Sequence, residues 1–183
     1  MLHLSLENPR NLNAGTIYLA KSRRNWSWMP PKEEMLRELA NPPKNTQGMN
    51  EDQRTQAEED TQSLRNFSML AAIEVNPACD HSQNNIRLGR FVVGLLVPVA
   101  SVNQKLMKSK TQFIWQFGPV FIENATARGE YYFFLSARHL VTLSLKKSKR
   151  LKPFARLRGQ AFTDLQAWLS HQSSRPGIVI LDR

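Results

Sequence analysis

Four long apolar stretches between residues 68 and 145 constrain the fold of this chain more than any other feature. They are rich in β-branched and aromatic residues, which suit a pleated and half-buried surface. The second and fourth are too apolar for simple alternation, which indicates strands that are bent or buried on both faces. The four stretches are SMLAAIEV (68–75), RFVVGLLVPV (90–99), TQFIWQFGPVFIE (111–123) and EYYFFLSARHLVTLSL (130–145).

Shorter segments complete the pattern of predicted elements. The polar segment 46–62 is either an exposed helix beginning near Asn50 or a disordered loop, because its low hydrophobicity suits both. Outside it we expect a strand over 15–22, a short helix over 32–39, a helical turn over 101–110 and a closing strand over 177–181.

The clearest helical periodicity follows Pro153. A proline is tolerated in the first turn of a helix, where its missing N–H costs nothing. From Phe154 to Leu169 the apolar side chains fall in one broad stripe at about 100° per residue, which predicts an amphipathic helix with a core-facing side. Strands followed by such a helix predict an α+β fold: a small, strongly bent β-sheet or an SH3-like barrel with the helix packed on it.

The chain is long enough for one domain with its own core, spanning residues 1–183. Within it we expect an N-terminal strand and short helix (1–40), a polar connector or insertion (41–66), and a β-rich core with the C-terminal helix (67–183).

Charge is distributed unevenly along the chain. Residues 1–90 carry eleven basic and eleven acidic residues, whereas residues 91–183 carry fourteen basic and four acidic ones, so the whole formal excess of +10 lies in the second half. The basic density peaks in KKSKRLKPFARLR (146–158). Such an excess predicts a polyanionic partner, most commonly nucleic acid, although a solvated basic face or docking on an acidic protein stays open.

The sequence argues against several function classes. No apolar run approaches the roughly 20 residues that a membrane-spanning helix needs, and the first residues do not resemble a signal peptide. The single cysteine, Cys79, excludes an internal disulfide and fits a reducing cytoplasm, so we expect a cytoplasmic protein with no membrane partner. Because no P-loop, GxGxxG, GxSxG, CxxC or HExxH motif occurs, we expect no cofactor and no metal site.

The segment EVNPACDHSQNN (74–85) gathers Cys, Asp, His and Gln where a predicted strand ends. On a continuing strand Cys79 and His81 would share one face, as a thiolate activated by an imidazole requires. The alternative is a small buried thiol beside a turn capped by the Asp80 carboxylate. Metal-independent RNA cleavage is a further hypothesis, because acidic, basic and imidazole groups can move protons and stabilise a phosphate without a cofactor. Its candidates are Asp80, His81, Arg87, Arg90, Arg138 and His139.

Basic residues stand next to aromatic ones in SRRNWSW (22–28) and in KKSKRLKPF (146–154). Arg and Lys would neutralise phosphates, and a tryptophan would stack on an unpaired base. Alternatively, the tryptophans anchor an irregular segment on the core. The candidates for nucleic-acid or partner binding are Arg23, Arg24, Trp26, Lys146, Lys147, Lys149, Arg150, Lys152, Arg156 and Arg158.

Three stretches resemble parts of known proteins. IEVNPACDHSQ (73–83) is similar to a P-x-CD-x-x-Q signature that follows a strand in uncharacterised bacterial proteins, many linked to phage defence or other conflict systems; Cys79, Asp80 and Gln83 match it. YYFFLSARHLVTL (131–143) and LRGQAFTDLQAWLSHQSSRPGIV (157–179) are similar to later parts of such proteins. In topology alone, the chain also resembles the PemK/MazF-like toxin barrel. It lacks the Arg-Pro step of that family, and no catalytic residue is carried over.

These observations rank three functions. The first is a basic nucleic-acid- or partner-binding module of a bacterial anti-phage or conflict system. We lean against an enzyme here; residues 146–158 would bind and the Cys79–Gln83 turn would fix the barrel or form a recognition pocket. The second is a metal-independent endoribonuclease of toxin type. The third is a structural subunit that docks on a larger effector protein or forms a homodimer.

Overall fold

The computed structural model describes residues 4–5, 13–20, 28–40, 50–83, 85–102, 113–123, 128–148, 151–157 and 159–173. The elements follow in the order β1 (Leu4–Ser5), β2 (Thr16–Leu19), α1 (Lys32–Ala40), α2 (Glu51–Phe67), β3 (Met69–Glu74), α3 (Ala78–Ser82), β4 (Leu88–Pro98), the 3-10 turn η2 (Val99–Ser101), β5 (Ile114–Glu123), β6 (Arg128–Ser144), α5 (Leu145–Ser148), β7 (Pro153–Leu157) and α6 (Gln160–Ser173).

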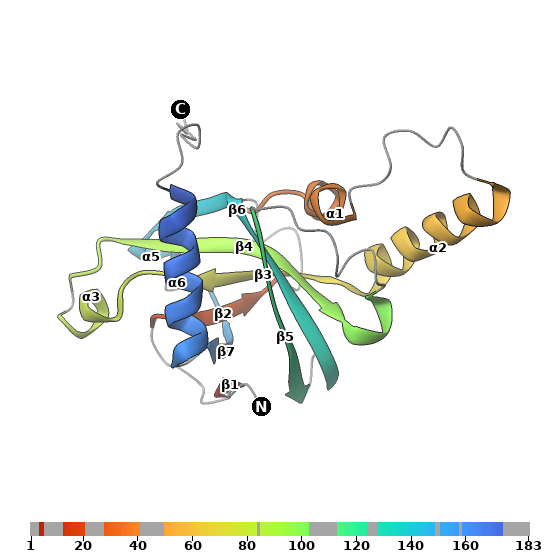
Figure 1. The fold of residues 1–183 in the computed structure, drawn as a ribbon. Coiled ribbons are helices and arrows are strands. Elements are labelled where there is room, and N and C mark those ends of the chain that lie inside the picture. Colours follow the sequence, from red (N-terminus) through yellow and green to blue (C-terminus); the bar gives the residue numbers. More distant parts are fainter. Residues whose placement is uncertain are drawn as a thin grey trace.

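The described strands form one antiparallel sheet in the order β1-β7-β2-β3-β4-β6-β5, to which β1 contributes two residues. The long strands β4, β5 and β6 twist and curl the sheet into an open half-barrel (Figure 1). The expected α+β fold with a small, strongly bent sheet is confirmed. The four apolar stretches that predicted strands correspond to β3, β4, β5 and β6.

Alternating side chains of β4 build two hydrophobic layers on opposite faces of the sheet. Val92 and Leu96 join the core formed with α6, where Leu165 is fully buried. Leu95 points to the opposite face of the sheet, where it joins a second core with Met35 of α1 and one residue of α2. Figure 1 shows α6 across one face and α1 and α2 on the other side of the sheet. The strand is therefore nearly continuous in apolar residues because both of its faces are covered.

The pairing of β4 with β6 is both close and irregular. A Cβ added at Gly94 would lie 2.0 Å from the main-chain oxygen of Phe134, so no other residue fits at this crossing. One step along, Val92 pairs with Leu140 but Val93 pairs with Ser136, which leaves residues 137–139 as a bulge in β6. Bulges re-aim side chains and bend a strand. This one bends the sheet where Arg138 and His139 stand.

The helix expected to begin at Pro153 begins later, and this prediction is wrong over 153–157. These residues form β7, in which Ala155 pairs with Ile17 of β2. Gly159, with φ +58°, separates this strand from α6. The misassignment arose because the inward side chains of a short strand continued the apolar stripe of the following helix.

The polar segment after α1 is helical, as one of the two alternatives predicted. Helix α2 begins at Glu51, and Leu64 near its end is buried against the sheet. Lys32 of α1 donates hydrogen bonds to the main-chain oxygens of Arg65 (2.6 Å) and Ser68, which ties the end of α2 to α1. The turn expected over 101–110 falls largely, and the strand over 177–181 entirely, outside the described residues. In the part of the chain that is described, no helix is long and apolar enough to cross a membrane.

Candidate functional site

A buried carboxyl group closes strand β3. Glu74 follows the apolar run MLAAI and has no exposed surface. Burial raises the pKa of Glu74 to about 8; the N–H of Asn76 and the charge of Arg156 act against this rise, and Asp80 adds to it. A carboxyl group with this pKa retains its proton near neutral pH, unlike a carboxylate at the surface.

Helix α3 brings an imidazole onto this carboxyl group. Pro77 leads into the helix with an extended ψ of 143°, and the chain then turns so that His81 lies over the end of β3. His81 Nε2 is 2.9 Å from Glu74 Oε2, and its side chain is 10 % exposed. A carboxyl group and an imidazole nitrogen at this distance can share one proton, and the imidazole is the partly exposed member of the pair. This is the property that general acid–base chemistry needs.

Asn76 fixes the position of the carboxyl group. Its main-chain N–H donates to Glu74 Oε1 at 3.2 Å. Its side chain bridges to the neighbouring strand: Nδ2 donates to the main-chain oxygen of Leu88 (2.9 Å), and Oδ1 accepts from the main-chain N–H of Arg90 (2.7 Å). The buried Asn76 therefore locks the end of β3 against the start of β4.

Two further strands place polar side chains beside Glu74. Arg156 of β7 pairs in register with Thr16 of β2, and the β2–β3 register places Thr16 opposite Glu74. Arg156 Nε donates to the main-chain oxygen of Ala14 at 2.9 Å, which holds the guanidinium near the carboxyl group. The pKa of Tyr18 on the same face is raised, first by burial and then by Glu74. We call Glu74, Asn76, His81, Thr16 and Arg156 the Glu74 cluster.

The structure corrects the expected geometry around the cysteine. Cys79 and His81 lie on helix α3 rather than on a strand, so residues two apart point to different sides. His81 contacts Glu74, and the Cys79 thiol is exposed, which makes the alternative of a small buried thiol wrong. Gln83 is also exposed, at the end of α3. The strand geometry assumed for a thiolate–imidazole pair is therefore wrong.

A second cluster lies at the bulge of β6. The Glu38 carboxylate of α1 accepts a hydrogen bond from Ser136 Oγ at 2.7 Å. Glu38 Oε1 is 3.6 Å from an Arg138 guanidinium nitrogen and 3.4 Å from His139 Nε2; the buried Nε2 is within ion-pair distance but not aligned for a hydrogen bond. The Arg138 guanidinium also covers the ring of Phe113 at 4.4 Å. We call Glu38, Ser136, Arg138 and His139 the Glu38 cluster.

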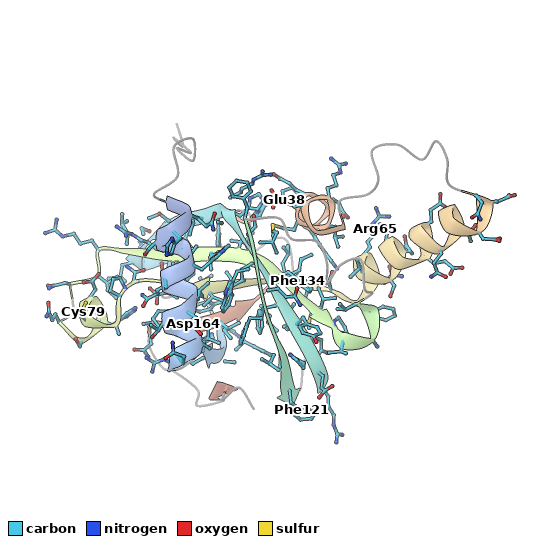
Figure 2. All side chains as sticks on the ribbon, in the orientation of Figure 1. Glu38, Arg65, Cys79, Phe121, Phe134 and Asp164 are labelled. Carbon is cyan, nitrogen blue, oxygen red and sulfur yellow. The ribbon has the colours of Figure 1, made fainter. Side chains whose placement is uncertain are left out.

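The contacts thus divide the proposed catalytic residues between two carboxyl groups. His81, with Asp80 beside it, belongs to Glu74, whereas Arg138 and His139 belong to Glu38. Figure 2 shows Cys79 of α3 and Glu38 of α1 on well-separated parts of the molecule. The four candidates therefore do not form one constellation.

Exposed basic side chains from two distant segments gather at one end of the sheet. Arg87 and Arg90 lie at the start of β4, and Lys146 and Lys147 lie on α5. Helix α5 contacts β4, because Ser148 Oγ packs against Gly89. Lys152 is exposed just before β7, but Arg156 is half-buried in the Glu74 cluster. The remaining binding candidates lie outside the described residues: Arg23, Arg24, Trp26, Lys149, Arg150 and Arg158.

Sequence reasoning missed Glu74, Asn76 and Glu38 as site residues. For Glu74 a signal existed, since an acid directly after five apolar strand residues is unusual in a buried position. For Glu38 there was none, because its partners Ser136 and His139 are about one hundred residues away in sequence and meet it only in the fold. Among the described residues, no three His, Cys, Asp or Glu side chains gather in a group that could hold a metal ion.

Comparison of the chain with protein families, with curated proteins and with solved structures finds no match.

Proposed function

We propose that the protein is a nucleic-acid-binding module of a bacterial anti-phage or conflict system, and that it contacts phosphates through its basic end. The basic end is Arg87, Arg90, Lys146 and Lys147. One observation carries the proposal: these exposed cations come from two segments far apart in sequence and meet where α5 packs on β4. The placement in a defence system is supported by the resemblance around Cys79, Asp80 and Gln83.

Within the described residues, the acids of the second half belong to elements other than those of the basic end. Glu123 and Glu130 belong to the far end of the β5–β6 hairpin. In the strand register Glu123 lies opposite Arg128, and Glu130 lies opposite Phe121. Asp164 accepts a hydrogen bond from Gln160 within α6. The half-buried Asp80 is the acidic side chain on the neighbouring helix α3. Cations in excess at one end attract a polyanion and release its counterions on binding.

The test is fluorescence anisotropy with labelled RNA and DNA at rising salt. We expect affinity to fall linearly on logarithmic axes, and the double variant Lys146→Glu/Lys147→Glu to lower the slope by about 1 per lysine. Arg37→Glu, on the exposed side of α1, makes the same charge change as Lys147→Glu alone and should leave binding intact. Unchanged binding by the double variant would remove the basic end from the interface. No binding at low salt would refute the proposal and favour an acidic protein partner.

A metal-independent endoribonuclease is the second candidate, and the Glu74–His81 pair favours it. In such cleavage a base takes the proton of the ribose 2′-hydroxyl while its oxygen attacks the phosphorus. An acid then protonates the leaving 5′-oxygen, which yields a 2′,3′-cyclic phosphate and a 5′-hydroxyl. His81 would take the 2′-hydroxyl proton and return it to the leaving 5′-oxygen, the buried Glu74 would hold the imidazole in place, and Arg156 would balance the charge on the phosphate.

This candidate predicts RNA cleavage that persists in chelator. Cleavage should be lost in His81→Ala and in Glu74→Gln, and retained in His139→Ala, since His139 belongs to the Glu38 cluster. Binding is measured on the same variants, so that loss of cleavage is separated from loss of affinity. Equal cleavage by wild type, His81→Ala and Glu74→Gln would exclude the pair from the chemistry.

A further inference from the structure

The first half of β4 pairs with the second half of β6, and one face of this two-stranded ribbon is exposed. Direct pairing of Leu88 with Ser144, of Arg90 with Thr142 and of Val92 with Leu140 puts these side chains on the same face. Val92 is fully buried in the core under α6, whereas Leu88 and Arg90 on the same face are exposed. Beyond Val92 the face is exposed. We call Leu88, Arg90, Leu140, Thr142 and Ser144 the open ribbon face.

Two large apolar side chains are exposed on this face. Leu88 is 48 % exposed and Leu140 is 43 % exposed. They are two of the four large hydrophobic residues exposed among the described residues, the others being Phe67 and Phe121. A single exposed leucine is ordinary, but here the two flank Arg90 on one face of one ribbon. They lie about 13 Å apart along the strand direction, four residues at the usual rise.

The charge around the face selects the kind of partner. The open ribbon face contains no acid, and Arg87, Lys146 and Lys147 stand at its end. A ligand that fits must offer negative charge at a regular spacing and flat apolar surfaces between the charges. Single-stranded nucleic acid offers both, because its bases are free to leave their stack. A duplex offers its phosphates but hides its base faces.

We propose that the open ribbon face holds the bases of single-stranded nucleic acid against Leu88 and Leu140, while the cations of the basic end bind the neighbouring phosphates. The inference rests on the proposed function and adds its substrate class. Arg90 would serve both parts, because a guanidinium plane stacks on bases and its charge pairs with phosphate.

The experiment compares three probes of one length at equal salt: a single-stranded oligonucleotide, the matching duplex, and an abasic strand that keeps the phosphates without the bases. Wild type should bind the single strand most tightly. The double variant Leu88→Ser/Leu140→Ser should bind it at least about fivefold more weakly, with an unchanged salt slope, because apolar contacts release no counterions. On the abasic strand this variant should equal wild type.

Two further variants make the result specific. Phe121→Ser removes a comparably exposed apolar side chain, 54 % exposed, at the far end of β5 (Figure 2), and should bind like wild type. Thr142→Asp puts a negative charge in the middle of the face and should weaken binding of all three probes.

The outcomes separate the two proposals. Equal affinity for single strand and duplex, with no effect of the leucine variant, would overturn the open ribbon face and leave phosphate binding in place. Tighter binding of the duplex would also overturn it. Absence of binding to every probe at low salt would refute the proposed function itself.

Discussion

The Glu74 and Glu38 clusters contain the same chemical groups in opposite electrostatic states. Each has one glutamate, one histidine close to it and one nearby arginine. Burial dominates at Glu74 and raises its pKa to about 8. At Glu38 burial acts in the same direction, but His139, Ser136 and Arg138 together outweigh it and hold the pKa below the ordinary value of 4.5. The depth of burial and the placement of the partners, not the residue types, decide which glutamate keeps its proton.

The difference assigns different work to the two sites. A carboxyl group that keeps a proton at neutral pH, hydrogen-bonded to an imidazole, suits proton transfer. A carboxylate that stays ionised and receives several donors from β6 suits attachment of α1 to the bulge of the sheet. Four measurements test whether the two glutamates differ in this way.

The largest effect is expected from removing the buried carboxyl group. Glu74→Ala removes the carboxyl group that contacts His81 and the N–H of Asn76 and opens a void, which should lower the free energy of unfolding by about 3 kcal/mol. Glu38→Ala should lower it by only about 1 kcal/mol, because the Glu38 side chain is 18 % exposed and water can occupy the place of its carboxylate. Urea unfolding measures both. Similar losses in the two variants would contradict the assignment of different roles.

The pH dependence of stability should have opposite signs at the two sites. Glu74 holds its proton more tightly in the folded protein, so its contribution is full below its ordinary pKa of 4.5 and is lost as pH rises towards about 8. The change is at most about 1.4 kcal/mol per pH unit. Glu38, with a lowered pKa, contributes above 4.5 and loses that contribution as pH falls.

Urea midpoints recorded from acidic to mildly alkaline pH test these signs. Glu74→Gln should flatten the decline on the neutral side, and Glu38→Gln should flatten the decline on the acidic side. If both variants flattened the decline of the urea midpoint on the same side of the pH range, the two glutamates would not differ as described.

A smaller effect is expected at the hydroxyl group that holds Glu38. Ser136→Ala removes the 2.7 Å hydrogen bond, and should destabilise the protein by roughly 1 kcal/mol and raise the pKa of Glu38. An NMR titration of the Glu38 side chain measures the pKa directly. A pKa that did not move would mean that His139 and Arg138 alone hold the carboxylate ionised.

The smallest effect is expected at the cysteine. Cys79 is exposed on α3, so Cys79→Ser should change stability by less than about 0.5 kcal/mol, whereas the thiol of the folded wild type should react at once with a thiol reagent. His81→Ala, two residues further on, should destabilise α3 clearly more. Equal effects would mean that the helix is not held by the Glu74–His81 contact.

Sequence patterns predicted the parts of the fold that depend on local chemistry. Strands β3 to β6 were recognised because β-branched and aromatic runs of that length have few other solutions, and α1 because it lies between prolines. The start of α6 was misplaced, since Phe154 and Leu157 of a strand occupy positions that also fit a helical stripe. Gly159, with a φ of +58°, precedes α6, and a backbone angle leaves no trace in periodicity.

The sites were predictable only as far as they were local. His81 was identified as a candidate, but its partner was expected to be Cys79, because a strand was assumed where Pro77 starts a short helix. The Glu38 cluster depends on a bulge of three residues, which shifts the register of β6 and brings His139 towards α1. Such a shift follows from packing across the whole sheet, as the close approach at Gly94 shows, and not from the residues in the bulge.

The position of β7 has a consequence for how the chain is made. This strand lies between β1 and β2, although it is the last of the described strands to be synthesised. Until it leaves the ribosome, the N-terminal strands lack their shared neighbour, and Arg156 is absent from the side of Glu74. The nascent protein therefore keeps an open strand edge until β7 has been synthesised, a state that favours pairing with other chains. Docking of β7 covers that edge and completes the Glu74 cluster in one step, so the last of the described strands to be synthesised is also the one that completes the site.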